Sequence, residues 1–232
     1  MLTFYWLDFT TKDHPGLYSL VLYTSWCNFR CYGCHNRTLA GWDYQYERNS
    51  EENLKNIWRK IININPEDFH QPLSEEEIKM AVQNDFLDMV ILCWWEVLIN
   101  KLEDVIKTIK WIKKLNPNVL IRIDTNWSFP EKVKHLRESK LVDGFAIDIK
   151  WPYWNKNWWP LISKVIWLPE NTASNIFPKI LESIHLADEM PYTLFRTVHY
   201  PIIDDESYFE EIKNYVKENL KSPHSINPFI EV

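Results

Sequence analysis

Hydrophobic and polar positions follow two different periods along this chain. Short apolar runs predict strands at Leu17–Thr24, Asp88–Cys93, Val119–Ile123, Gly144–Ile149 and Tyr192–Tyr200, with Ser225–Val232 as a candidate sixth. Apolar residues at helical spacing predict helices at Glu51–Asn63, after Ser74, from Leu102 to about Asn116, from about Pro130, at 173–188 and at 206–220. The Trp- and Pro-rich stretch Trp151–Pro169 fits neither period and predicts an irregular loop.

Strands that alternate with helices of 10–15 residues are typical of a parallel sheet with right-handed crossovers. We expect an α/β fold, a partial (β/α)6 TIM-like barrel, in a single domain spanning 1–232. Within it we expect a loop at 26–36 that carries the cysteines and a C-terminal extension at about 201–232. In such folds the chemistry lies at the carboxyl ends of the strands.

Composition narrows the function classes. The net charge is -6 and there is no long basic run, which argues against a nucleic-acid-binding surface. No apolar run reaches the roughly 20 residues of a membrane span, and the N-terminus lacks the pattern of a secretory signal. We therefore expect a cytoplasmic protein that binds neither nucleic acid nor membrane.

Three of the four cysteines form the pattern C-x3-C-x2-C at Cys27, Cys31 and Cys34. Clustered cysteines in a chain without an export signal indicate metal or redox ligands rather than disulfides. Three thiolates can bind three irons of a [4Fe-4S] cluster and leave the fourth iron open to another ligand. The alternative is a zinc ion with His35 as the fourth ligand.

Polar motifs follow the predicted strands at the edge where a site is expected. They are Trp94-Trp95-Glu96, Asp124-Thr125-Asn126, the pair Asp148 and Lys150, and Arg196 within the last long strand. Together with the cysteine loop they predict a pocket at one rim of the sheet. For the charged members, internal salt bridges are the alternative interpretation. Cys93 is interpreted as a buried core thiol.

From about Tyr5 to about Pro201 the chain resembles radical S-adenosylmethionine (SAM) enzymes, and within them the activating enzymes of glycyl-radical proteins. The anchors are Asp13-His14-Pro15-Gly16, the stretch Cys27 to Asn36, Asp124-Thr125-Asn126, Ile147-Asp148-Ile149-Lys150 and Phe195-Arg196-Thr197. The resemblance is strongest to activases of anaerobic ribonucleotide reductase. It implies a radical SAM core, a [4Fe-4S] cluster, SAM as cofactor, and a flavodoxin or ferredoxin as electron donor. Alternatives are a pyruvate formate-lyase activase, a deazaguanine synthase-like enzyme or a non-catalytic metal-binding module.

The resemblance also implies roles for individual residues. Cys27, Cys31 and Cys34 would bind the cluster, and Tyr32 would border the adenine of SAM. Glu96 would fix the methionyl amino group directly or by holding its loop. The remaining SAM-binding positions would be Trp94, Trp95, Asp124, Thr125, Asp148, Lys150 and Arg196, of which the last two are cations suited to the SAM carboxylate.

Four positions depart from the family in the same direction. Similar chains have glycine where this one has Trp26, Trp94, Trp95 and Trp127. The whole chain has 4 Gly and 13 Trp, whereas average usage gives about 16 glycines. We hypothesise that such positions are UGA codons in an organism that translates UGA as glycine, and UGG codons there would refute this. The alternative is an inactive homologue.

Overall fold

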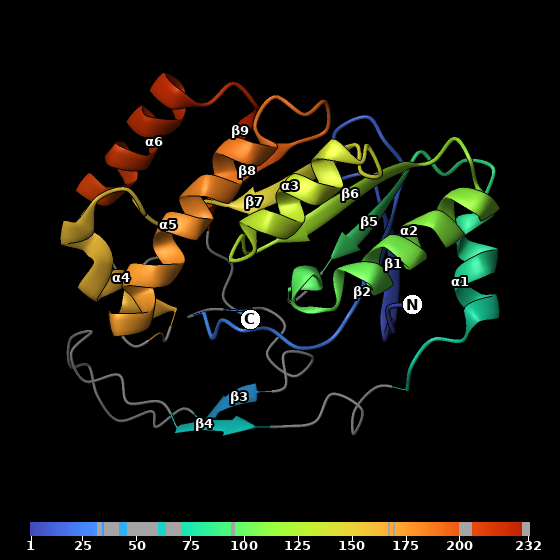
Figure 1. The fold of residues 1–232 in the computed structure, drawn as a ribbon, viewed down its shortest axis with the longest axis horizontal. Helices are drawn as coiled ribbons and strands as arrows, with labels where there is room; N and C mark the ends of the chain where they lie inside the picture. Colours follow the sequence, from blue (N-terminus) through green and yellow to red (C-terminus); the bar gives the residue numbers. More distant parts are fainter. Residues whose placement is uncertain are drawn as a thin grey trace.

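The computed structural model describes residues 1–31, 34, 42–45, 60–63, 71–93, 96–166, 168, 170–199 and 206–228. Its main element is a seven-stranded sheet in the order β1-β2-β5-β6-β7-β8-β9 (Figure 1). β1 pairs antiparallel with β2, and every other pairing in this sheet is parallel. The strands are β1 Trp6–Thr10, β2 Ser19–Tyr23, β5 Met89–Cys93, β6 Leu120–Thr125, β7 Gly144–Asp148, β8 Leu194–His199 and β9 His224–Pro228.

Helices connect successive parallel strands and pack on the sheet. In Figure 1, α2, α3 and α5 run across the near face of the sheet. Among the described residues, no helix is both long and apolar enough to cross a membrane. The helices are α1 Glu75–Val82, α2 Leu102–Leu115, α3 Pro130–Glu138, α4 Trp159–Val165, α5 Glu170–Ala187 and α6 Ser207–Asn219, with 3-10 turns η3 Val97–Ile99 and η4 Lys156–Trp158.

Alternation along the strands divides the sheet into two unlike faces. In β2, Leu20 and Leu22 join the large core under the helices, whereas Val21 and Tyr23 join a small cluster on the opposite face. Successive side chains of a strand point to opposite faces, and directly paired residues share a face. Ile91 belongs to the small cluster and pairs directly with Arg122. Arg122, and Asp124 two residues later, therefore lie on the face opposite the large core.

The α/β class and most of the predicted elements are confirmed. All six predicted strands of the parallel sheet and the helices after Ser74, Leu102, Pro130, 173 and 206 match observed elements within a few residues. α1 begins with the predicted capping box, in which Ser74 accepts from the N–H of Glu77 and Glu77 accepts from the N–H of Ser74. The closure of the sheet into a partial barrel stays a prediction.

Two predictions about local structure were wrong. Residues Lys60–Asn63 form strand β4, paired antiparallel with β3 (Trp42–Gln45), and not the end of a helix over Glu51–Asn63. The rest of that predicted helix, 51–59, lies outside the described residues. The stretch Trp151–Pro169 is not simply irregular, because it contains η4 and α4. The edge strand β1 was not predicted.

Candidate cofactor site at the strand ends

The candidate site lies where the parallel strands end. β2, β5, β6, β7 and β8 run in the same direction, so their carboxyl ends meet at one edge of the sheet. The cysteine loop follows β2, Glu96 follows β5, and Asp124 and Thr125 close β6. Asp148 closes β7, and Arg196 pairs with it from β8. The predicted site residues in the described part of the chain therefore lie at one rim.

The cysteine loop is held by its own backbone and by the loop after β6. The N–H of Phe29 donates to Sγ of Cys27 at 3.3 Å, and the N–H of Cys34 donates to the carbonyl of Cys31 at 3.3 Å. Asn126 Nδ2 lies 3.7 Å from Sγ of Cys27. The first cysteine therefore has two N–H donors directed at its sulfur, and such bonds by themselves stabilise a thiolate.

Three short polar side chains connect this loop to the end of β6. Asn126 Nδ2 donates to Oδ1 of Asn28 at 2.7 Å, and Asn28 Nδ2 donates to Oγ of Ser128 at 2.9 Å. Ser128 in turn donates through both its N–H and its hydroxyl to Oδ1 of Asn126. This closed set of hydrogen bonds fixes the loop that carries Cys27 against a rigid strand end.

The thiols have the chemistry that an iron-sulfur cluster requires. All three are free of disulfides. Desolvation, and then repulsion from Cys31, raises the pKa of Cys27 well above its usual value. Desolvation also raises the pKa of Cys31 to about 12, partly offset by Lys150. Neighbouring desolvated thiols are ionised readily only when a cation binds them, because the metal replaces the lost hydration.

The cysteine loop supplies a set of thiol donors for a metal centre. In the part of the chain that the structure describes, no three His, Cys, Asp or Glu side chains lie close enough to hold a single metal ion. The cysteines of a cluster each bind a separate iron, so they need not converge on one point. His35, the fourth ligand of the zinc alternative, lies outside the described residues. The donor set of three thiols on one loop fits a [4Fe-4S] cluster.

Glu96 is fully buried and joins three loops. Its Oε1 accepts from the N–H of Leu98 at 3.0 Å and from the hydroxyl of Thr125 at 2.6 Å, and its Oε2 accepts from the N–H of Asn126 at 2.6 Å. Its own N–H donates to the carbonyl of Trp26 at 3.2 Å. Glu96 therefore ties the loop after β5 to the end of β6 and to the start of the cysteine loop.

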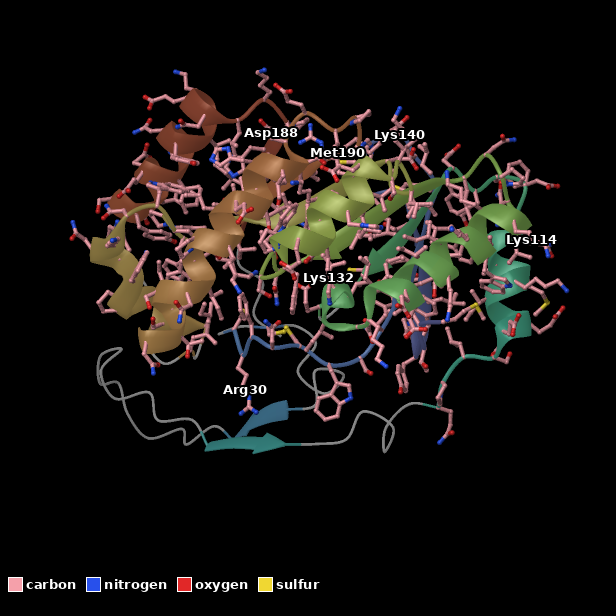
Figure 2. The ribbon with its side chains drawn as sticks, in the orientation of Figure 1. Arg30, Lys114, Lys132, Lys140, Asp188 and Met190 are labelled. Carbon is pink, nitrogen blue, oxygen red and sulfur yellow. The ribbon has the colours of Figure 1, made fainter. Side chains whose placement is uncertain are left out.

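Burial raises the pKa of Glu96 to about 7, although the bonds from Thr125, Asn126 and Leu98 oppose the shift. The positive charge of Lys132 also opposes the rise in this pKa. Figure 2 marks Lys132 beside η3, where its Nζ donates to the carbonyls of Leu98 and Asn100 at 2.6 and 2.9 Å. The residue that joins the loops is therefore a carboxyl group that titrates near neutral pH.

A chain of ion pairs crosses the sheet on the face opposite the large core. Arg122 Nε donates to Oδ1 of Asp124 at 3.0 Å, and Arg196 Nη2 lies 3.1 Å from Oδ2 of Asp124. Arg196 Nε donates to Oδ1 of Asp148, and Lys150 Nζ donates to its Oδ2 at 2.7 Å. The salt bridges expected as an alternative for these charged residues are therefore present. This set of ion pairs contains three cations, Arg122, Arg196 and Lys150, and two carboxylates, Asp124 and Asp148.

These pairings keep Asp148 ionised at a partly buried site. Desolvation alone would raise the pKa of Asp148, but attraction to Lys150 and Arg196 lowers it well below its usual value. Attraction to Asp148 and Asp124 likewise outweighs desolvation and raises the pKa of Arg196. Asp148 and Arg196 therefore stay charged over the physiological pH range.

Three of the predicted site residues, Tyr32, Trp94 and Trp95, lie outside the described residues. The others fall into three connected groups, which are the cysteine loop with Cys27, Cys31 and Cys34, the buried pair Glu96 and Thr125, and the ion-paired set Asp124, Asp148, Lys150 and Arg196.

Sequence reasoning missed several residues at this site. Arg122 was not selected, although a charge two positions before Asp124 in an apolar strand is a period-two signal for the same face. Asn28 and Ser128 were also missed, and neither carries a sequence signal by itself. Cys93 is partly buried rather than a core thiol, and its Sγ lies 3.7 Å from Oδ2 of Asp124.

Comparison with known proteins gives one informative likeness. No known family profile matches this chain. A protein of Methanocaldococcus jannaschii, provisionally named a glycyl-radical enzyme activating enzyme, is 25% identical over 213 residues, which cover 91% of this chain and 74% of the relative. The similarity is weak but extends over most of the chain. It supports a likeness to activating enzymes of glycyl-radical proteins and does not distinguish among their targets.

Proposed function

We propose that this chain is a radical SAM activating enzyme that generates a glycyl radical on a partner protein, with anaerobic ribonucleotide reductase as the partner. The observation that carries the proposal is the three-cysteine loop, fixed at the edge of a parallel sheet where charged side chains converge. The named relative supports the same class of activity.

In this proposal Cys27, Cys31 and Cys34 bind a [4Fe-4S] cluster as thiolates. A cluster bound there would supply the one-electron reduction of SAM that hydrogen abstraction from a glycine Cα of the partner requires. The hydrogen bonds from Phe29 and Asn126 orient Cys27 and favour its ionised form.

The remaining residues orient SAM. Lys150 and Arg196 provide positive charge for its methionyl carboxylate, and Asp124 and Asp148 hold these cations in place. Thr125 and the loop joined by Glu96 border the methionyl amino group and ribose. Tyr32, Trp94 and Trp95 belong to the same pocket in this proposal. A flavodoxin or ferredoxin delivers the electron from outside.

Anaerobic reconstitution tests the proposal. With iron, sulfide and a reductant we expect a brown protein, and with dithionite and SAM we expect 5′-deoxyadenosine in the products. The matched control for cluster binding is Cys93→Ser, which removes the cysteine outside the loop and should leave the brown colour intact. A colourless protein that retains zinc, or a brown one that leaves SAM uncleaved, contradicts the proposal.

A further inference from the structure

Four non-glycine residues in the described part of the chain have a positive φ angle. They are Trp26 at 70°, Trp127 at 72°, Lys140 at 53° and Glu189 at 69°. In an L-residue this conformation presses Cβ against the backbone carbonyl oxygen, so glycine adopts it freely and bulky residues rarely do. Two of the four being tryptophan requires a reason.

Lys140 and Glu189 have an ordinary reason, because each lies just beyond a helix. Figure 2 marks Lys140 past the end of α3, where its N–H donates to the carbonyl of Arg137 at 3.1 Å. Glu189 follows α5, which ends at Ala187, and its N–H donates to Oγ of Ser222. Helices commonly end in one left-handed residue stabilised by such bonds. No special chemistry is needed at these two positions.

Trp26 does not follow a helix. It lies between the end of β2 and Cys27, and its carbonyl accepts from the N–H of Glu96 at 3.2 Å. Its side chain is 48% exposed, so burial of the indole does not compensate fully for the backbone conformation. The backbone of Trp26 is thus bonded to the loop after β5 while its side chain is about half exposed.

Trp127 does not follow a helix either, because it lies in the loop between β6 and α3. Its N–H donates to Oγ1 of Thr125 at 3.1 Å and its carbonyl accepts from Oγ of Ser183 at 2.8 Å, so its backbone is held from both sides. The indole is fully buried, and among the described residues its Nε1 has no hydrogen-bond acceptor. Burying an unsatisfied N–H is unfavourable.

The two glycines that the structure describes occupy positions that need glycine. Gly16 has φ of +84°, and a Cβ on Gly144 would lie 2.2 Å from the backbone carbon of Tyr192. Glycine is therefore placed by geometric need, yet the chain has only 4 glycines against 13 tryptophans. The other tryptophans that the structure describes, Trp6 and Trp151 among them, do not have positive φ, so the backbone makes no such demand there.

We propose that positions 26 and 127 are glycine in the protein that the cell makes, through UGA codons translated as glycine. Glycine keeps every backbone hydrogen bond named above, removes the steric conflict at positive φ and removes the unsatisfied indole N–H. The proposal rests on backbone geometry and not on the proposed function, so it stands or falls separately from SAM cleavage.

The gene and the native protein give the first test. We expect UGA at codons 26 and 127, and peptide mass spectrometry of the protein purified from its own organism should find the mass of glycine at both positions. UGG codons, or peptides with the mass of tryptophan, overturn the proposal. Neither readout depends on catalytic activity.

Paired variants give the second test, made in the chain as written. At position 127, Trp127→Gly and Trp127→Ala remove nearly the same volume, and at position 26 the same pair removes an exposed indole. We expect each glycine variant to melt about 2–4 °C above its alanine partner, because alanine keeps the Cβ conflict. The control is Trp111 in α2, where Trp111→Ala should melt above Trp111→Gly. Alanine variants as stable as glycine variants at 26 and 127 overturn the proposal.

Discussion

Replacing Glu96 by glutamine perturbs the junction of three loops at the candidate site. The amide oxygen of glutamine can still accept from Leu98 and Thr125, which both donate to Oε1. Its NH2 group, however, faces the N–H of Asn126, which now donates to Oε2 at 2.6 Å. Two donors then face each other in a buried place, and leaving a buried donor without an acceptor costs about 1–3 kcal/mol.

The pH dependence gives a second, sharper signature. Burial raises the pKa of Glu96 from 4.5 to about 7. Because the folded pKa lies above the unfolded one, the stability that protonated Glu96 contributes is complete below pH 4.5 and is lost as pH rises through about 7. The difference between the two pKa values corresponds to about 3 kcal/mol. Glutamine does not titrate, so Glu96→Gln lacks this loss.

Urea unfolding of the metal-free protein, followed by circular dichroism from pH 5 to pH 8, measures both effects. We expect Glu96→Gln to be less stable than the parent at pH 5 and the difference to shrink or reverse towards pH 8. The matched control is Glu77→Gln, an exposed carboxylate whose pKa is lowered by Ser74, so that it titrates below this window. Parallel curves for the parent and Glu96→Gln would refute the role assigned to this carboxyl group.

Three further changes test other parts of the account. Cys27→Ser should abolish the visible absorbance of the reconstituted protein while Cys93→Ser retains it, and equal loss in both would contradict the assigned ligands. Arg196→Gln removes one of the cations beside Asp148 and so raises the pKa of that carboxyl group. We expect acid unfolding to move to higher pH and the free energy of unfolding to fall by about 2 kcal/mol. An unchanged midpoint of acid unfolding would contradict this role of Arg196. The carboxylate of Glu211 accepts from the indole N–H groups of Trp154 and Trp158 and from the side-chain amide of Asn155. Glu211→Ala leaves these donors without their acceptor and should lower the free energy of unfolding by about 1–3 kcal/mol. An unchanged melting temperature would show that water replaces the bonds.

The parallel sheet was predictable because its signals are local. Each parallel strand is a short apolar run, and each helix between strands has an apolar stripe or a capping signal such as Ser74 with Glu77. The edge strand β1 was not predictable in this way, since its residues are mostly exposed or partly exposed and its pairing with β2 supplies the order. An edge strand has little burial to mark it in the sequence.

The two wrong predictions have different causes. In β4, the adjacent residues Ile61 and Ile62 fit a helical stripe as well as a strand, and pairing with β3 decides between them. α4 was missed because its 7 residues, Trp159–Val165, are too few to show a clear apolar stripe. Pro160 near its start was a usable signal, since proline is favoured in the first turn of a helix.

The position of the site at one edge of the sheet was predictable, and the pattern of ion pairs within it was not. That Asp124, Asp148 and Arg196 meet follows from the rule that parallel strands end at one edge. Which charges pair across strands depends on strand register, which pattern alone does not specify. Arg122 lies in the same strand as Asp124, and its spacing of two residues was a signal that was not used. The left-handed backbone of Trp127 is a further feature that only the three-dimensional structure reveals.

The central claim is that this chain removes a hydrogen atom from a glycine of a partner protein. The direct measurement uses the reduced, reconstituted protein, SAM and an anaerobic ribonucleotide reductase whose glycines carry deuterium at Cα. The account predicts one deuterium in the 5′-deoxyadenosine that forms and a glycyl radical signal by electron paramagnetic resonance. Unlabelled 5′-deoxyadenosine without a glycyl radical would contradict it.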